Sequence, residues 1–278
     1  SAKTSKQPPA DIGQLPVIQI IQSNAHFINL QTNNQTDIKR FSLRSATSND
    51  QNARQLLLVC QVLHKHPLTA VNLSISTRLK IEKNHTIHFA PLRITSKWTT
   101  IKTPLKQPIT LQLTGDIQLI HANFTANLLG KFSGSDGSIN LNAARQKNRI
   151  NSTIKITNMN LMTLVEMLTG HRWIDGRINL TTQLKTQGKA FSDWMKYLSG
   201  TGDFQIADGK IYGVDIGNLI SSTLKQKNTE SSNDSYTAFK QISANYQIRR
   251  GIFTTNNLAL ASKNINASGQ GRINLPDT

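Results

Sequence analysis

The stretch RINLTTQL, residues 177–184, alternates between polar and apolar side chains. In an extended chain, Ile178, Leu180, Thr182 and Leu184 lie on one face, and the residues between them lie on the other. An apolar face opposite a polar one is typical of a strand whose sheet is covered on one side only. The stretch therefore predicts a β-strand whose apolar face points towards the interior.

The same alternation recurs in short segments along most of the chain. They are residues 17–21, 73–81, 109–119, 154–156, 178–184, 204–206, 246–248 and 258–260. Residues that favour turns lie among them: Gly115-Asp116, Ser135-Asp136-Gly137, Asp208-Gly209, Arg250-Gly251 and Gly269-Gln270-Gly271. Parallel strands need a dozen or more connecting residues, which this spacing does not leave. The pattern predicts a mainly β protein built as an antiparallel meander.

About three short amphipathic helices are expected to interrupt the strands, all in the second half of the chain. Apolar residues recur at helical spacing in residues 161–168, where Asn160 is placed to cap the helix and Gly170 to end it. The spacing returns in residues 191–198, and Asp215 is placed to cap a third helix. Helices this few and short are expected to cover only part of a long sheet.

The composition agrees with β structure and points to anionic partners. Glu occurs only at residues 82, 166 and 230, which disfavours a helical protein with charged solvent faces. The net charge of +17 predicts affinity for phospholipid headgroups, lipopolysaccharide or nucleic acid, and charge alone does not distinguish them. Cys60 is the only cysteine, so a disulfide within the chain and a cysteine-based zinc site are excluded. No run approaches the roughly 18 apolar residues of a membrane span.

Two longer segments carry a resemblance to a known family. They are WIDGRINLTTQLKTQG, residues 173–188, and SGTGDFQIADGKIYGVDIGNLI, residues 199–220. In their order of strand, helix, glycine-punctuated strand and helix, they resemble the C-terminal region of AsmA-family proteins. YTAFKQISANYQIRRGIFTTNNLALASKNINASGQGRINL, residues 236–275, is similar to the closing strands of that family, including a final G-x-G-x-I-x-L. Residues 15–150 resemble the family in their strand-rich, low-aromatic texture.

The resemblance implies an elongated, twisted antiparallel sheet curled into a groove. It also implies a protein anchored in the inner membrane of Gram-negative bacteria that projects into the periplasm, with an anchor that we expect to lie outside this sequence. The larger relatives are regarded as bridge-like lipid carriers. We therefore expect a periplasmic scaffold that binds or transfers lipid, supports outer-membrane biogenesis, and has phospholipid or another anionic lipid as its partner.

This hypothesis divides the chain into three parts and names candidate groove residues. Residues 1–14 are expected to form a flexible tail, residues 15–150 a β-rich groove segment, and residues 151–278 an AsmA-like segment with short helices. The candidates for the lipid-binding face are Ile154, Ile156, Ile178, Leu180, Leu184, Phe204, Ile206, Ile248, Leu258 and Leu260.

Other sites find little support in the sequence. A histidine metal site is conceivable at His64, His66, His85 and His88, but no carboxylate lies at ligand spacing. Asp203, Asp208 and Asp215 suit a strand start, a turn and a helix cap better than acid–base chemistry.

We therefore expect no enzyme, no cofactor and no metal. The basic residues are scattered and are not interleaved with aromatic ones, so a solvated basic surface is expected and a nucleic-acid partner is not.

Two alternatives to the lipid groove remain open. One is a packed β-sandwich, whose apolar face is covered by protein. The other is a non-enzymatic structural or interaction module that assists outer-membrane protein assembly. A face wholly covered by protein side chains would remove the physical basis for lipid binding.

Overall fold

A computed structural model of the chain describes residues 17–29, 34–48, 53–64, 69–82, 84–100, 109–133, 136–169, 171–188, 191–213, 236–263 and 265–275. The strands are β1 (Gln19–Asn29), β2 (Asn34–Thr47), β3 (Ala53–His64), β4 (Thr69–Ile81), β5 (Thr86–Thr100), β6 (Ile109–Ile120), β7 (Asn123–Phe132), β8 (Ser138–Gln146), β9 (Arg149–Asn160), β10 (Ile174–Gln187), β11 (Ser199–Tyr212), β12 (Tyr236–Arg249), β13 (Ile252–Ala261) and β14 (Asn266–Asn274). The helices are α1 (Leu161–Thr169) and α2 (Phe191–Lys196).

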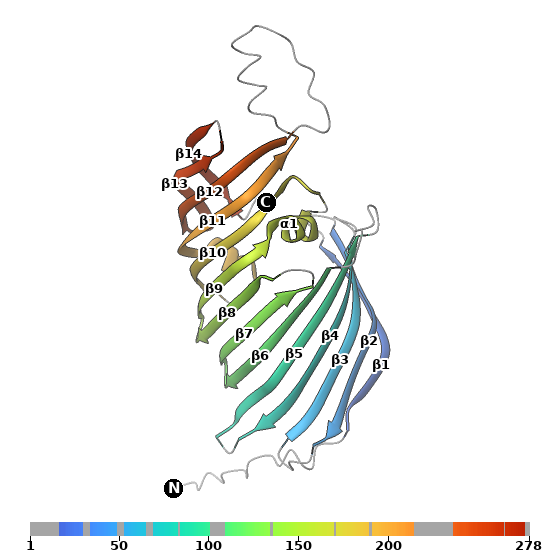
Figure 1. The fold of residues 1–278 in the computed structure, drawn as a ribbon. Helices are drawn as coiled ribbons and strands as arrows, with labels where there is room; N and C mark the ends of the chain where they lie inside the picture. The colour runs from blue at the N-terminus through green and yellow to red at the C-terminus, as the bar shows by residue number, and fades with distance from the viewer. Residues whose placement is uncertain are drawn as a thin grey trace, which may run out of the picture.

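The strands form one 14-stranded sheet in which each strand pairs with its neighbour in the sequence. Every pairing is antiparallel, and the sheet runs from β1 at one edge to β14 at the other without closing on itself. Figure 1 shows it as a twisted, curved sheet, with the blue N-terminal strands at the bottom and the red C-terminal strands at the top. The predictions of a mainly β fold and of an antiparallel meander are confirmed.

The alternating segments lie within strands, except that residues 17 and 18 precede β1, and three of the five predicted turns were wrong. Gly115-Asp116 lies inside β6, Asp208-Gly209 inside β11, and Gly269-Gln270-Gly271 inside β14. A Cβ at Gly115 would overlap the backbone carbonyl of Asn127 on β7, so this glycine serves a close strand approach and not a turn. Asp208 has a φ of 49°, which is consistent with a bulge in the strand.

Two of the expected helices lie where the apolar spacing predicted them. The backbone N–H of Thr163 donates a 2.9 Å hydrogen bond to the side-chain oxygen of Asn160, which satisfies one of the free donors at the start of α1. The described residues contain these two helices and not three, because the segment after Asp215 lies outside them. Neither helix in the described part is long and apolar enough to cross a membrane.

The tightest packing lies at the end of the strands where α1 sits. Leu161 and Val165 of α1 pack with a cluster of buried residues that includes Met159, Ile178 and Phe239. In Figure 1, α1 lies at the right-hand ends of the middle strands, and the turns after β6 and β8 lie at the left-hand ends. The helix therefore closes one rim of the sheet.

The sheet continues without interruption across the middle of the chain. Ile150 lies inside β9, and β8 and β9 pair from Ser138 with Thr157 to Gln146 with Arg149. The tail predicted for residues 1–14 lies outside the described residues.

Candidate functional site

One row of apolar side chains crosses the sheet almost from edge to edge. Paired residues of neighbouring antiparallel strands lie on the same face, so the register defines this row. We call it the central lane: Ile20, Leu43, Leu58, Ile75, Ile94, Leu113, Gly130, Ile139, Ile156, Leu180, Phe204 and Ala244. It spans β1 to β12, and strands lie about 4.8 Å apart, so its length is roughly 50 Å. We call the side of the sheet that carries it the apolar face.

Most side chains of the central lane keep part of their surface accessible. Ile20 is 37% exposed, and the large side chains from Leu43 to Phe204 are half-buried. By contrast, Met159 and Ile178 beside α1 are 1% and 8% exposed. Thus α1 covers the apolar face at one rim, and the described residues leave the lane between the rims only partly covered.

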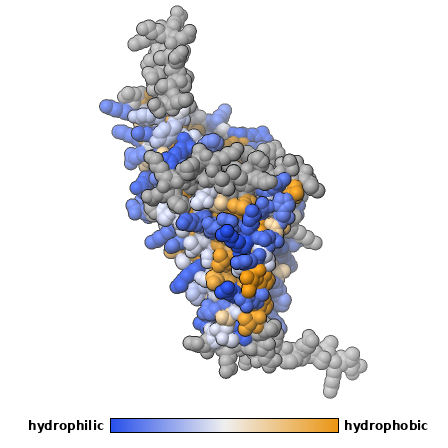
Figure 2. Space-filling model, turned by 90° about the vertical axis from the view of Figure 1, so that its right-hand side faces the viewer, coloured by the Kyte–Doolittle hydropathy of each residue, from blue (hydrophilic) through white to orange (hydrophobic). Residues whose placement is uncertain are grey.

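The opposite face, which we call the polar face, has a different composition. Its corresponding row is Arg44, Leu57, Ser76, Arg93, Thr114, Leu129, Asn140, Lys155, Thr181, Asp203 and Asn245. Leu57 and Leu129 are exposed exceptions, at 42% and 49%. Figure 2 shows orange apolar side chains in a band down the lower half of the molecule, at the height of the first strands, with blue polar side chains on either side. The sheet is therefore amphipathic along its length.

All ten candidate groove residues lie on the apolar face. Leu180 pairs with Ile156 and Phe204 on its two sides, and Ile178 pairs with Ile206. The other candidates extend this surface: Ile154 pairs with Thr182, Leu184 and Ile248 lie on either side of Gly200, Leu260 pairs with Ile242, and Leu258 lies two residues before Leu260. Ile178, Ile206 and Ile248 are buried, and the other seven are half-buried.

Sequence reasoning named no candidate residue in the N-terminal half of the face. Leu43, Leu58, Ile75, Ile94 and Leu113 occupy the central lane there. The run LLLV at residues 56–59 obscures the alternation in β3, since Leu57 and Val59 are apolar residues on the polar face. The alternation in residues 73–81 and 109–119 predicted an apolar face for each of these strands. It did not predict the register that aligns these faces into one row.

An aromatic group lies on the apolar face in the C-terminal part. The ring of Tyr246 lies 4.9 Å from that of Phe253 and 6.4 Å from that of Phe204, centroid to centroid. Tyr246 pairs with Gly202, where a Cβ would overlap the tyrosine hydroxyl. Burial raises the pKa of Tyr246, while a hydrogen bond with Thr182 opposes the shift. The glycine of the GTGDF stretch thus leaves the space that the tyrosine ring fills.

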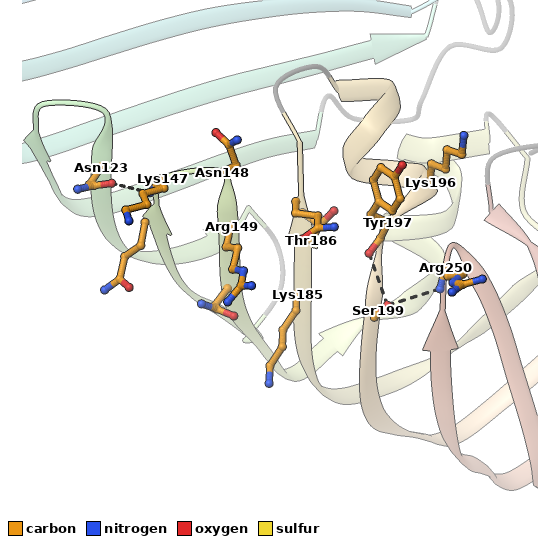
Figure 3. A pocket seen from close by; sticks show the side chains of 13 residues that line it. Asn123, Lys147, Asn148, Arg149, Lys185, Thr186, Lys196, Tyr197, Ser199 and Arg250 are labelled. Atoms are coloured by element: carbon orange, nitrogen blue, oxygen red, sulfur yellow. Dashed lines mark hydrogen bonds between the residues drawn. The ribbon is translucent and has the colours of Figure 1, made fainter.

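A basic pocket lies at the rim opposite α1. Its volume is about 1570 Å³, and its lining includes Lys147, Arg149, Lys185, Lys196 and Arg250 (Figure 3). The remaining lining residues are Asn123, Gln146, Asn148, Asn151, Thr186, Gln187, Tyr197 and Ser199. We call this set of residues the basic rim. Sequence reasoning placed these cations in a scattered solvated surface, because they come from separate segments.

The histidines do not come together. His64 ends β3 at the rim near α1, whereas His88 lies near the start of β5, at the other rim, where its Nε2 atom lies 3.3 Å from a carboxylate oxygen of Glu82. His85 lies in the turn before β5, and His66 lies outside the described residues. Within the described part of the chain, no group of three or more His, Cys, Asp or Glu side chains is placed to hold a metal ion.

The aspartates are also separate. Asp203 is exposed on the polar face of β11, Asp208 lies in the bulge of the same strand, and Asp215 lies outside the described residues. Each of the two described aspartates occupies a position that its strand geometry explains.

Comparison with known proteins gives one family. The model of the AsmA family matches residues 113–258, from the middle of β6 to β13, and so covers more than half of the chain. The match begins well before the segments that carry the sequence resemblance, and it includes the central lane from Leu113 onwards. No curated protein and no solved structure matches the chain. With its continuous β meander and its amphipathic sheet, the chain belongs to the AsmA family.

Proposed function

We propose that the protein is a lipid-handling scaffold whose apolar face holds acyl chains. The observation that carries this proposal is the central lane, an apolar row across twelve strands in which most of the large side chains are half-buried. Water at such a surface costs free energy, at about 25 cal/mol for each Å² of apolar area. A surface of this length that protein does not fully cover calls for an apolar ligand or partner.

The dimensions favour a path for lipid over a pocket for one small molecule. The lane is roughly 50 Å long, while the acyl chains of one bilayer leaflet extend about 15 Å. Several chains would fit end to end along it. The two helices of the described residues support the same reading, because α1 and α2 lie at the rims of the sheet near β10 and do not extend over most of the lane.

The family supports a proposal for the cellular setting. AsmA-family membership is consistent with a role in outer-membrane or lipid-related biogenesis, and we propose that the protein acts in the periplasm, anchored to the inner membrane. The proposed activity is binding and transfer without covalent chemistry. Phospholipid or another anionic lipid is the proposed ligand, since the net charge of +17 favours anionic headgroups.

One observation favours a second candidate, a structural module that assists outer-membrane protein assembly. The edge strand β1 exposes Ile21, Phe27 and Ile28 at 57%, 56% and 47%. An open strand edge with exposed apolar side chains can pair with a strand of another protein. On this alternative, strand addition at β1 would be the main activity and the central lane would stay free of lipid.

A pair of labelled variants tests the lipid proposal. In a Cys60→Ala background, which removes the only native thiol, Leu113→Cys places an environment-sensitive fluorophore on the central lane. Gln112→Cys places it one residue away on the polar face, where the native side chain is exposed. Adding phospholipid should shift the emission of the first label to the blue and leave the second unchanged.

Native mass spectrometry provides an independent measurement. Protein extracted gently from the periplasm should retain phospholipid, and the bound mass should identify its class. Protein that is free of lipid, together with equal emission changes at both labelled positions, would contradict the proposal and favour the interaction module.

A further inference from the structure

The basic rim brings cations from distant parts of the sequence into one place. Lys147 and Arg149 come from the turn between β8 and β9 and the start of β9, Lys185 from the end of β10, Lys196 from α2, and Arg250 from the turn after β12. None of the described residues that line the pocket is acidic. Such a concentration of positive charge repels itself unless an anion neutralises it.

Backbone hydrogen bonds join the segments that carry these cations. The N–H of Gly188 donates to the carbonyl of Asn148 at 3.0 Å, and the N–H of Gly251 donates to the carbonyl of Leu198 at 2.8 Å. The N–H of Lys147 donates to the side-chain oxygen of Asn123 at 2.7 Å. The cations are therefore presented from a connected scaffold, and their proximity does not depend on one flexible loop.

Three carboxylates of the described residues pair with basic side chains away from the pocket. Glu166 accepts a 2.8 Å bond from Arg172 beside α1, and Glu82 pairs with His88 at the start of β5. Asp37 pairs with His26 on the first two strands. These three carboxylates therefore do not neutralise the basic rim.

The basic rim adjoins the apolar face. Ile150 and Thr186 pair with each other on that face, and Thr186 also lines the pocket, whereas Arg149 and Lys185, their neighbours in the sequence, lie on the polar face. Figure 3 shows the side chains of Arg149 and Lys185 reaching away from the sheet on the same side. The two faces meet at this rim, so headgroup phosphates bound by these cations on the polar side would lie next to the end of the apolar face.

The chemistry of the lining suits a phosphate-bearing membrane surface. Lysine and arginine bind phosphate oxygens through charge-assisted hydrogen bonds. Tyr197 is 43% exposed beside them, and the ammonium group of Lys196 lies 5.9 Å from its ring centroid. Tyrosine is enriched at the level of lipid headgroups, where its ring meets apolar chains and its hydroxyl meets water.

We propose that the basic rim docks the protein onto a bilayer that contains anionic phospholipid, with headgroup phosphates in the pocket. This inference rests on the lipid-handling function proposed above and adds the place at which lipid enters or leaves the apolar face. A cluster of basic residues at a membrane surface contributes about a fivefold gain in binding for each Lys or Arg. Removing three cations should therefore weaken binding on the order of a hundredfold.

Vesicle flotation tests the docking site with two variants of equal charge. The rim variant is Arg149→Gln, Lys185→Gln and Lys196→Gln, all exposed residues. The control variant is Arg93→Gln, Lys97→Gln and Lys131→Gln, which are exposed on the polar face and remove the same three charges from the net +17. Vesicles of phosphatidylcholine alone are compared with vesicles of phosphatidylcholine and phosphatidylglycerol in equal parts.

The expected result is that the native chain and the control variant bind the anionic vesicles, whereas the rim variant loses about a hundredfold in affinity. Equal losses in both variants would show that net charge alone drives binding, and no loss in the rim variant would place the docking surface elsewhere. Either result overturns the proposal. The proposal is also overturned if the rim variant keeps its vesicle binding but loses binding to a duplex nucleic acid. That result would favour a different phosphate-bearing partner.

Two further measurements are needed. The first distinguishes a site for free phosphate from one for lipid headgroups, and the second distinguishes the docking site from the lipid-handling function. Inorganic phosphate added to the native chain should compete weakly, and complete displacement at low concentration would indicate a site for free phosphate instead of a bilayer. Capture of a monomeric fluorescent phosphatidylcholine should be equal in the rim variant and the native chain. Failure of capture in all proteins would refute the lipid-handling function, whereas intact capture with unchanged vesicle binding would refute only the docking site.

Discussion

Leu113→Asp provides the sharpest test of the central lane, because it places a carboxylate at the middle of the row. Leu113 is half-buried between Ile94 on β5 and Gly130 on β7, where its methyl group covers the space above the glycine. Fully burying a leucine side chain contributes about 1.5 to 3 kcal/mol, so the loss of a half-buried one should cost about 1 to 2 kcal/mol. A domain with a stability of roughly 5 to 15 kcal/mol tolerates this cost.

The expected result is a folded protein that no longer captures acyl chains. A carboxylate on a partly open face stays hydrated in the free protein, but it must be dehydrated when an acyl chain covers it, and this costs several kcal/mol. The assays are thermal melting followed by circular dichroism, and capture of a fluorescent phospholipid. Gln112→Asp is the matched control, since it adds the same charge to the polar face of β6 opposite Lys131. It should affect neither measurement.

Two results would refute this reasoning. If Leu113→Asp prevents folding, the lane at this position is a packed core, because a buried and unpaired carboxylate exceeds the stability margin of a domain. If the variant folds and captures lipid normally, the acyl chains lie elsewhere. Loss of capture in Gln112→Asp would show that the assay responds to charge and not to position.

Two further predictions concern the aromatic group on the apolar face. Gly202→Val should lower the free energy of unfolding in urea by about 1 to 3 kcal/mol, because the new side chain meets Tyr246 and the carbonyl of Thr181. Gly271→Val should have little effect, since the nearest atom to a Cβ there is a methyl group of Thr255 at 3.9 Å, and an equal loss in both variants would contradict the packing argument. Burial raises the pKa of Tyr246 above its usual value near 10, so the stabilisation by the neutral phenol should be complete below that pH and fall as the pH rises through the raised pKa. Tyr246→Phe should remove this part of the alkaline loss in a series of urea titrations, and an unchanged pH dependence would show that another group causes it.

The local features of the fold were largely encoded in short stretches of sequence. Alternation in residues 109–119 and 178–184 predicted strands with one apolar face, because the side chains of an extended chain point alternately to its two sides. Asn160 predicted the start of α1, because its side-chain oxygen is placed to accept a hydrogen bond from an unpaired N–H. Both effects act over a few residues, and no distant part of the chain is needed to produce them.

The glycines show where local reasoning failed. Gly115 and Gly209 were interpreted as turn residues, but they lie inside β6 and β11. A Cβ at Gly209 would overlap the ring of Phe239, which lies thirty residues further along the chain. Glycine serves both a turn and a close approach, and only the identity of the neighbour across the sheet decides between them.

The sequence by itself determined that this protein has strands with one apolar face, few helices and a high positive charge, since each property depends on composition or on neighbours along the chain. Tertiary structure alone decided that these faces join into one lane, because register between strands is a long-range choice that alternation leaves open. Ile75 and Leu180, for example, belong to the same lane although more than a hundred residues separate them. The same holds for the basic rim, where Arg149 and Arg250 meet only because the meander returns the chain to the same rim at every second turn.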